Sequence, residues 1–100
     1  MRRFLCLALA AVVSSLFLAA CDEEVVIRNT CGSTLTDVKV DDESVGDLAN
    51  GQEKKADVDK HGRTPITWKY NGVSQSDQIS GTGVYEGAVY NLDCTYGDWQ

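Results

Sequence analysis

Most of this chain alternates apolar and polar side chains residue by residue, and this pattern constrains its fold more than any other feature. Ile66, Trp68 and Tyr70 share one face of a predicted strand, and Val38 and Val40 share a face of another. A period of two is typical of half-buried strands, whereas an amphipathic helix repeats every 3.6 residues. About seven short strands at intervals of roughly 8–12 residues predict an all-β domain, either a sandwich or a small barrel.

Turn residues separate the predicted strands. The dipeptides Asn50-Gly51 and Asn71-Gly72 are strong signals for tight turns. Within the second strand, the alternation predicts Thr36 on the same face as Val38 and Val40. The polar strand 73–79 is expected at a sheet edge or facing solvent. We expect strands over residues 24–30, 34–41, 45–48, 53–59, 65–70 and 73–79, one or two more within 84–94, and a tail over 96–100.

A tryptophan and a later segment sharpen the predicted architecture. Trp68 on its strand is followed by Glu86-Gly87-Ala88-Val89-Tyr90-Asn91-Leu92. This order resembles the immunoglobulin pattern of a core tryptophan and an Asp-x-Ala-x-Tyr-x-Cys segment. Leu92 stands where that pattern has its cysteine, and Cys94 comes two residues later. The resemblance implies a small immunoglobulin-like β-sandwich, and a small antiparallel β-barrel is the alternative.

The first 21 residues differ in character from the rest of the chain. Met1-Arg2-Arg3 is a positive head, and residues 4–17 are apolar apart from two serines. A basic head, an apolar core and a small-residue processing site are typical of a secretory signal peptide. The apolar run is shorter than the about 20 residues that a membrane-spanning helix needs. The run ends in Leu18, Ala19, Ala20 and Cys21.

Leu18-Ala19-Ala20-Cys21 resembles the lipobox of bacterial lipoprotein precursors. In that family the cysteine thiol receives diacylglycerol, a lipoprotein signal peptidase cleaves before the cysteine, and the new amino terminus is usually acylated. The resemblance implies that residues 1–20 are a cleaved signal peptide and that a lipid on Cys21 anchors the protein to a membrane. The alternative is an ordinary secretory signal peptide with an incidental cysteine.

The lipobox also implies a location. We expect the bacterial cell envelope, with the protein facing the periplasm if the cell is Gram-negative. Asp22 resembles the signal that retains lipoproteins in the inner membrane of enteric bacteria, and the outer membrane is the alternative. Residues 21–24 are expected to be the lipid anchor and a short acidic tether, and residues 25–100 a single β domain.

Cysteine counting predicts one disulfide bond. The mature chain, residues 21–100, is one small domain with a thin margin of stability. Cys6 leaves with the signal peptide and Cys21 carries the lipid, so Cys31 and Cys94 remain. Two thiols in an exported domain usually pair, and the alternative is two unpaired buried thiols. On the chain-entropy account, closing this long loop contributes roughly 4 kcal/mol.

Acidic residues outnumber basic ones in the mature chain, and this limits the classes of macromolecule that it can bind. Seven Lys and Arg residues stand against fifteen Asp and Glu, a side-chain charge of −8. This balance excludes nucleic acid and favours a basic protein as any macromolecular partner. His61 is the only histidine and has no neighbour in sequence that would make it a general base. We therefore expect no enzymatic activity, no cofactor and no metal site.

Ser80-Gly81-Thr82 is the candidate binding loop. Residues 80–85 resemble the serine-glycine loop with which lipoprotein inhibitors of c-type lysozyme enter the enzyme's cleft. Those inhibitors are small, exported, acidic β-barrels with disulfides, and lysozyme is basic, so the charges would be complementary. A Gly-rich hairpin turn accounts for the same residues. The sequence predicts a lipid-anchored binding or structural module of the cell envelope; the alternative is an inhibitor of a basic envelope-directed enzyme such as c-type lysozyme.

Overall fold

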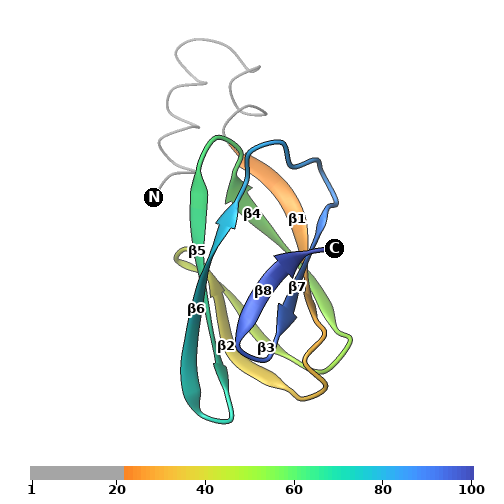
Figure 1. Cartoon of the computed structure of the whole chain (residues 1–100), viewed down its shortest axis with the longest axis vertical. Helices are drawn as coiled ribbons and strands as arrows, with labels where there is room; N and C mark the ends of the chain where they lie inside the picture. The colour runs from red at the N-terminus through yellow and green to blue at the C-terminus, as the bar shows by residue number, and fades with distance from the viewer. Residues whose placement is uncertain (1–21) are drawn as a thin grey trace.

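The computed structural model describes residues 22–100 as two packed β-sheets (Figure 1). One sheet has the strand order β4-β1-β7-β8 and the other has the order β3-β2-β5-β6. The strands are β1 (Asp22–Asn29), β2 (Leu35–Val40), β3 (Glu43–Leu48), β4 (Glu53–Asp59), β5 (Arg63–Tyr70), β6 (Val73–Ser80), β7 (Val89–Asp93) and β8 (Tyr96–Trp99). The predicted all-β sandwich is confirmed, and strand pairing does not close the two sheets into the alternative barrel.

The pairing of β1 distinguishes this sandwich from the immunoglobulin domain. β1 lies between β4, with which it is antiparallel, and β7, with which it is parallel. All other neighbouring strands are antiparallel. Immunoglobulin constant domains have the strand orders ABED and CFG. The likeness to that family is therefore one of architecture, and the strand order differs.

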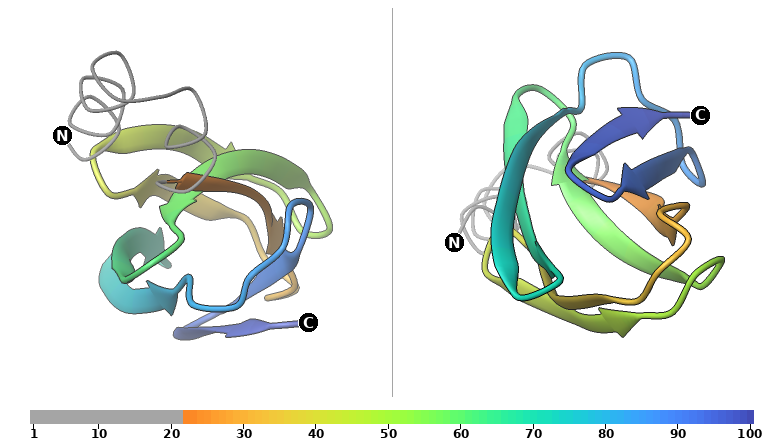
Figure 2. Two further views of the ribbon diagram at one scale, coloured as in Figure 1. Left: turned by 90° about the horizontal axis from the view of Figure 1, so that it is seen from above. Right: turned by 60° about the horizontal axis from the view of Figure 1, so that its bottom comes forward.

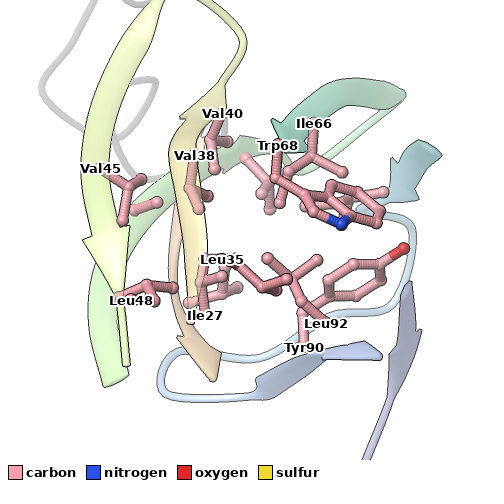
Figure 3. Close-up of a cluster of buried hydrophobic side chains, with 14 of the residues drawn as sticks. Ile27, Leu35, Val38, Val40, Val45, Leu48, Ile66, Trp68, Tyr90 and Leu92 are labelled. Atoms are coloured by element: carbon pink, nitrogen blue, oxygen red, sulfur yellow. The ribbon is translucent and has the colours of Figure 1, made fainter. Parts of the chain in front are cut away.

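The two sheets face each other (Figure 2), and the buried apolar side chains between them form one hydrophobic core. Trp68 on β5 and Tyr90 on β7 enter it from facing sheets and lie near each other in Figure 3. Burial of these apolar side chains supplies most of the driving force for folding. The buried apolar residues are Val25, Ile27, Leu35, Val38, Val40, Val45, Leu48, Ala56, Val58, Ile66, Trp68, Ile79, Ala88, Tyr90 and Leu92.

A bulge in β2 shifts the buried face of that strand. Asp37 has a φ of 51°, and the register of β2 against β3 changes between Leu35 and Val38. The main-chain N–H of Asp37 donates to Oδ1 of Asp47 on β3 at 3.0 Å. Leu35 is therefore buried together with Val38, while Thr36 is exposed. The prediction of Thr36 on the same face as Val38 is wrong, because the bulged residue interrupts the alternation.

The end of the chain forms a strand where we predicted a tail. β8 pairs with β7, with Tyr96 opposite Asp93 and Trp99 opposite Tyr90. The rings of Tyr90 and Trp99 meet edge to face, with centroids 5.1 Å apart, a favourable aromatic geometry. A Cβ atom on Gly97 would lie 2.3 Å from Cε2 of Tyr90, so only glycine lets β8 pass over that ring.

One charged side chain crosses each open side of the sandwich. Nζ of Lys54 on β4 donates to the carbonyl oxygen of Val45 on β3 at 2.9 Å. On the other side, Oδ2 of Asp77 on β6 accepts a hydrogen bond from the N–H of Gly97 on β8 at 2.9 Å. Each of these side chains forms a hydrogen bond with the main chain of an edge strand in the other sheet. The bonded main-chain groups are then not available for pairing with another protein chain.

The acidic residues that we predicted as a tether belong to β1. Asp22 pairs with Asp59, and Glu23 and Glu24 continue the same ladder with β4. Nζ of Lys60 lies 3.5 Å from Oε2 of Glu23, which offsets part of the charge. The backbone of Asp22–Glu24 is thereby fixed to the sheet, so these three residues form part of a strand.

Candidate functional site

Three segments meet at one end of the sandwich, which we call the Asp22 end (Figure 1). They are the start of β1 at residues 22–24, the β4–β5 turn at 59–63, and the connection between β6 and β7 at 81–88. The pairing of Asp22 with Asp59 joins the first two segments. The N–H of Gly87 donates to the carbonyl oxygen of Glu24 at 3.0 Å, which joins the third.

The lipobox residues Leu18, Ala19, Ala20 and Cys21 lie outside the described residues, as does the whole predicted signal peptide. Asp22, the predicted sorting residue, is the first residue of β1 and is half-buried. Cys21 precedes it by one peptide bond. Between residues 22 and 100 no helix is long and apolar enough to cross a membrane.

The candidate loop Ser80-Gly81-Thr82 lies at the Asp22 end, but its central residue is buried. Ser80 and Thr82 are exposed, whereas Gly81 packs against the β4–β5 turn. The N–H of Gly81 donates to the carbonyl oxygen of Gly62 at 2.9 Å. A Cβ atom at position 81 would lie 1.8 Å from the carbonyl oxygen of Asp59. Gly81, which we predicted as part of a binding loop, is therefore required for packing within the domain.

A shallow depression lies beside this loop. Tyr85 at its rim is 72% exposed, the highest value among the exposed large hydrophobic residues. The volume of about 200 Å³ is below the roughly 300–1,000 Å³ of sites that enclose a small molecule. The depression can therefore accept a side chain or part of a larger surface. Its lining residues are Thr82, Gly83, Val84, Tyr85, Ala88, Val89, Trp99 and Gln100.

Sequence reasoning missed this depression, because its walls come from two places in the chain. Tyr85 belongs to the β6–β7 connection, and Trp99 belongs to β8, which we predicted as a tail. The signal that could have found Tyr85 is an aromatic residue between Gly83 and Gly87. Two nearby glycines favour a turn, and a large aromatic side chain on a turn is often exposed for contact.

The predicted disulfide bond between Cys31 and Cys94 is present at the opposite end of the sandwich. Cys31 follows β1 and Cys94 follows β7, and these strands are parallel neighbours. The bond therefore joins the segments that follow two neighbouring strands of one sheet. Nε1 of Trp68 donates to the carbonyl oxygen of Cys94 at 2.9 Å, so the core tryptophan of the facing sheet contacts the segment after β7.

A buried asparagine organises the same end. Asn29 is fully buried, and its Nδ2 donates to the carbonyl oxygens of Ser33 at 2.7 Å and Leu48 at 2.8 Å. Its Oδ1 accepts a hydrogen bond from the N–H of Cys31 at 2.8 Å. Every polar atom of the amide group is thus paired, as burial requires. Asn29 lies within the predicted strand 24–30, and no role of its own was predicted for it from the sequence.

The acid and base groups of the described residues offer little for catalysis. His61 is exposed, and its main-chain N–H donates to Oδ1 of Asp59 at 2.9 Å. Burial and the nearby Asp77 carboxylate raise the pKa of Tyr90 well above its ordinary value, so its phenol stays protonated and donates to Asp77 at 3.2 Å. Within residues 22–100, no three His, Cys, Asp or Glu side chains come together as metal ligands.

No known protein family matches this chain, and comparison with curated proteins and with solved structures finds no significant match. The functional proposal below therefore depends on the residues and their geometry.

Proposed function

We propose that this protein is a lipid-anchored lipoprotein of the bacterial cell envelope that acts as a binding or structural module. The observation that carries the proposal is the start of β1 at Asp22, directly after the lipobox cysteine. A trans peptide spans 3.8 Å between Cα atoms. A lipid on Cys21 would therefore hold the Asp22 end at the membrane surface with no flexible linker between anchor and fold.

The disulfide bond supports export. Cys31 and Cys94 are bonded, and disulfides form and persist in oxidising compartments such as the bacterial periplasm. We propose that the anchored domain faces the periplasm if the cell is Gram-negative, in the inner membrane if Asp22 acts as the retention signal. A basic envelope protein remains the macromolecular partner that a side-chain charge of −8 favours.

The geometry gives the inhibitor alternative less support. Gly81 is buried against Asp59 and cannot enter an enzyme cleft without unpacking the β4–β5 turn. Ser80 and Thr82 lie at the Asp22 end, which an anchor on Cys21 would turn toward the bilayer. The test is cell-wall lysis by c-type lysozyme with an excess of residues 22–100. We expect unchanged lysis, and a dose-dependent loss of lysis would favour the inhibitor.

Metabolic labelling with a clickable fatty acid tests the anchor directly. We expect label on the wild-type chain and none on Cys21→Ser, because the thiol of Cys21 is the acceptor. Cys6→Ser is the matched control and keeps the label, since Cys6 is removed with the signal peptide. A wild-type chain without label would contradict the proposal.

Fractionation of the two membranes tests the sorting residue. In an enteric host, we expect the wild-type protein in the inner membrane and Asp22→Ser in the outer membrane. Glu23→Ser is the control because it alters the neighbouring residue on the same strand. Identical distributions of wild type and Asp22→Ser would remove the sorting role of Asp22 and leave the anchor itself unaffected.

A further inference from the structure

We propose that the β6–β7 connection rests on the membrane that holds the anchor, with the side chain of Tyr85 in the lipid headgroup layer. This inference depends on the proposed lipid on Cys21. It assigns to the Asp22 end a second, non-covalent contact with the bilayer, and it sets the orientation of the domain on the membrane.

The first argument is position. The acyl chains of a lipidated Cys21 must lie in the hydrocarbon layer, so Asp22 must lie at the headgroup layer, which is roughly 5–7 Å thick on each side. Glu24 is two residues further along β1, a rise of about 7 Å. The N–H of Gly87 donates to the carbonyl oxygen of Glu24, so the end of the connection that carries Tyr85 lies at the outer edge of the headgroup layer.

The second argument is that the connection has a defined conformation. The N–H of Val84 donates to the carbonyl oxygen of Gly81 at 3.1 Å, and the N–H of Ala88 donates to that of Tyr85 at 3.1 Å. Gly81 is itself fixed against the β4–β5 turn. Tyr85 is therefore presented by a folded turn rather than by a loose loop, and ordering it at a membrane costs little conformational entropy.

The third argument is the chemistry of the presented side chain. Tyr85 is 72% exposed although its ring is large and apolar. Tyrosine combines an apolar ring with a polar hydroxyl and is enriched at membrane–water interfaces for that reason. Val84 beside it is partly buried against the core. One exposed aromatic side chain on a fixed turn suits the interfacial layer better than it suits water.

Charge at this end does not favour anionic lipids. Lys60 pairs with Glu23, and Lys55 lies 3.9 Å from Glu24. Glu86, next to Tyr85, is exposed and negative. The contact is therefore made by the tyrosine ring, and we expect it on zwitterionic phosphatidylcholine without any anionic lipid.

Tyr96 supplies an internal control. It is also exposed, at 54%, but it begins β8 opposite Asp93, the last residue of β7. β7 runs parallel to β1 and away from the Asp22 end. β1 from Asp22 to Asn29 is about 23 Å long at the usual rise per residue, so Tyr96 would stand well clear of the headgroups.

The experiment uses the lipid-modified mature protein, residues 21–100, labelled with 3-fluorotyrosine and placed in phosphatidylcholine nanodiscs. Fluorine NMR is recorded with and without a nitroxide on the lipid headgroups, and Tyr85→Phe and Tyr96→Phe assign the two resonances. We expect the nitroxide to broaden the Tyr85 resonance severalfold and to leave the Tyr96 resonance unchanged. An unchanged Tyr85 resonance, or equal broadening of both, would overturn the inference.

The same samples separate the two proposals. A protein that carries fatty acid and co-migrates with the nanodiscs, but whose Tyr85 resonance is not broadened, overturns the membrane contact and leaves the anchor standing. A protein without fatty acid that does not co-migrate overturns the anchor, and the membrane contact fails with it.

Discussion

Oδ2 of Asp77 accepts a hydrogen bond from the main-chain N–H of Gly97 at 2.9 Å, and this bond links edge strands of the two sheets. The same oxygen accepts a hydrogen bond from the hydroxyl of Tyr90 at 3.2 Å. In a closed barrel, strand pairing would join these edges. Here one carboxylate makes the connection, and it accepts hydrogen bonds from both the N–H of Gly97 and the hydroxyl of Tyr90.

Removal of this carboxylate tests its contribution to stability. We expect Asp77→Ala to lower the free energy of unfolding by about 3 kcal/mol or more, because it removes two hydrogen bonds to a charged group, which contribute about 1.5–3 kcal/mol each. The measurement is urea unfolding of residues 22–100. Asp98→Ala on β8 is the control, since Asp98 is exposed, and we expect a change within about 0.5 kcal/mol. Equal losses in both variants would contradict the proposed link.

The pKa of Tyr90 predicts a loss of stability at high pH. Burial and the Asp77 carboxylate raise this pKa in the folded state, so above about pH 10 the unfolded chain releases a proton that the folded chain keeps. The stabilisation is complete below pH 10 and falls as pH rises beyond it, by at most about 1.4 kcal/mol per pH unit. We expect Tyr90→Phe to flatten this part of the stability curve, measured by urea unfolding between pH 8 and 11. An unchanged slope would sink the assignment.

The disulfide bond is expected to carry a large share of the stability of this small domain. For a loop of this length, the double variant Cys31→Ala and Cys94→Ala should lose roughly 4 kcal/mol on the chain-entropy account. Reduction of the wild-type protein should have a similar effect, as followed by urea unfolding. Thr95→Ala, an exposed position next to Cys94, is the control, and its midpoint should equal that of the wild type.

Substitutions in the candidate loop Ser80-Gly81-Thr82 test whether the loop serves packing within the domain or binding to a partner. We expect Gly81→Ala to destabilise the domain by more than about 2 kcal/mol, because the added Cβ meets the carbonyl oxygen of Asp59. Ser80→Ala and Thr82→Ala should leave thermal unfolding unchanged, since both side chains are exposed. A stable Gly81→Ala variant would show that the β4–β5 turn can move, and would reopen the binding role.

The buried asparagine gives a test at the opposite end. Asn29→Ala leaves the carbonyl oxygens of Ser33 and Leu48 and the N–H of Cys31 without their partners. Each buried unpaired group costs about 1–3 kcal/mol, so we expect a loss of about 3 kcal/mol in urea unfolding. Asn50→Ala removes one exposed hydrogen bond and should cost well under half as much. Similar losses would mean that water replaces the amide of Asn29.

The positions of seven of the eight strands followed from the sequence, because apolar alternation is a local property of the chain. Ile66 and Trp68 were expected on one face of a strand for the same reason, and both are buried. β8 could not be predicted, since Tyr96–Trp99 has no clear alternation and becomes a strand by pairing with β7 and packing on Tyr90. The bulge at Asp37 could not be predicted either. The strand keeps its apolar and polar residues, but the bulged residue changes which of them before Val38 face the core.

Strand period, cysteine number and motif spacing can be read without distant contacts, so the all-β class, the Cys31–Cys94 pair and a candidate anchor at Cys21 could be predicted from the chain alone. The fold was needed to show that β1 lies between β4 and β7, that Asp22–Glu24 belong to a strand, and that Gly81 is buried while Tyr85 is exposed. The physical reason is that strand neighbours and loop burial depend on which distant segments pack together, and hydrogen bonds between such segments leave no local pattern in the chain.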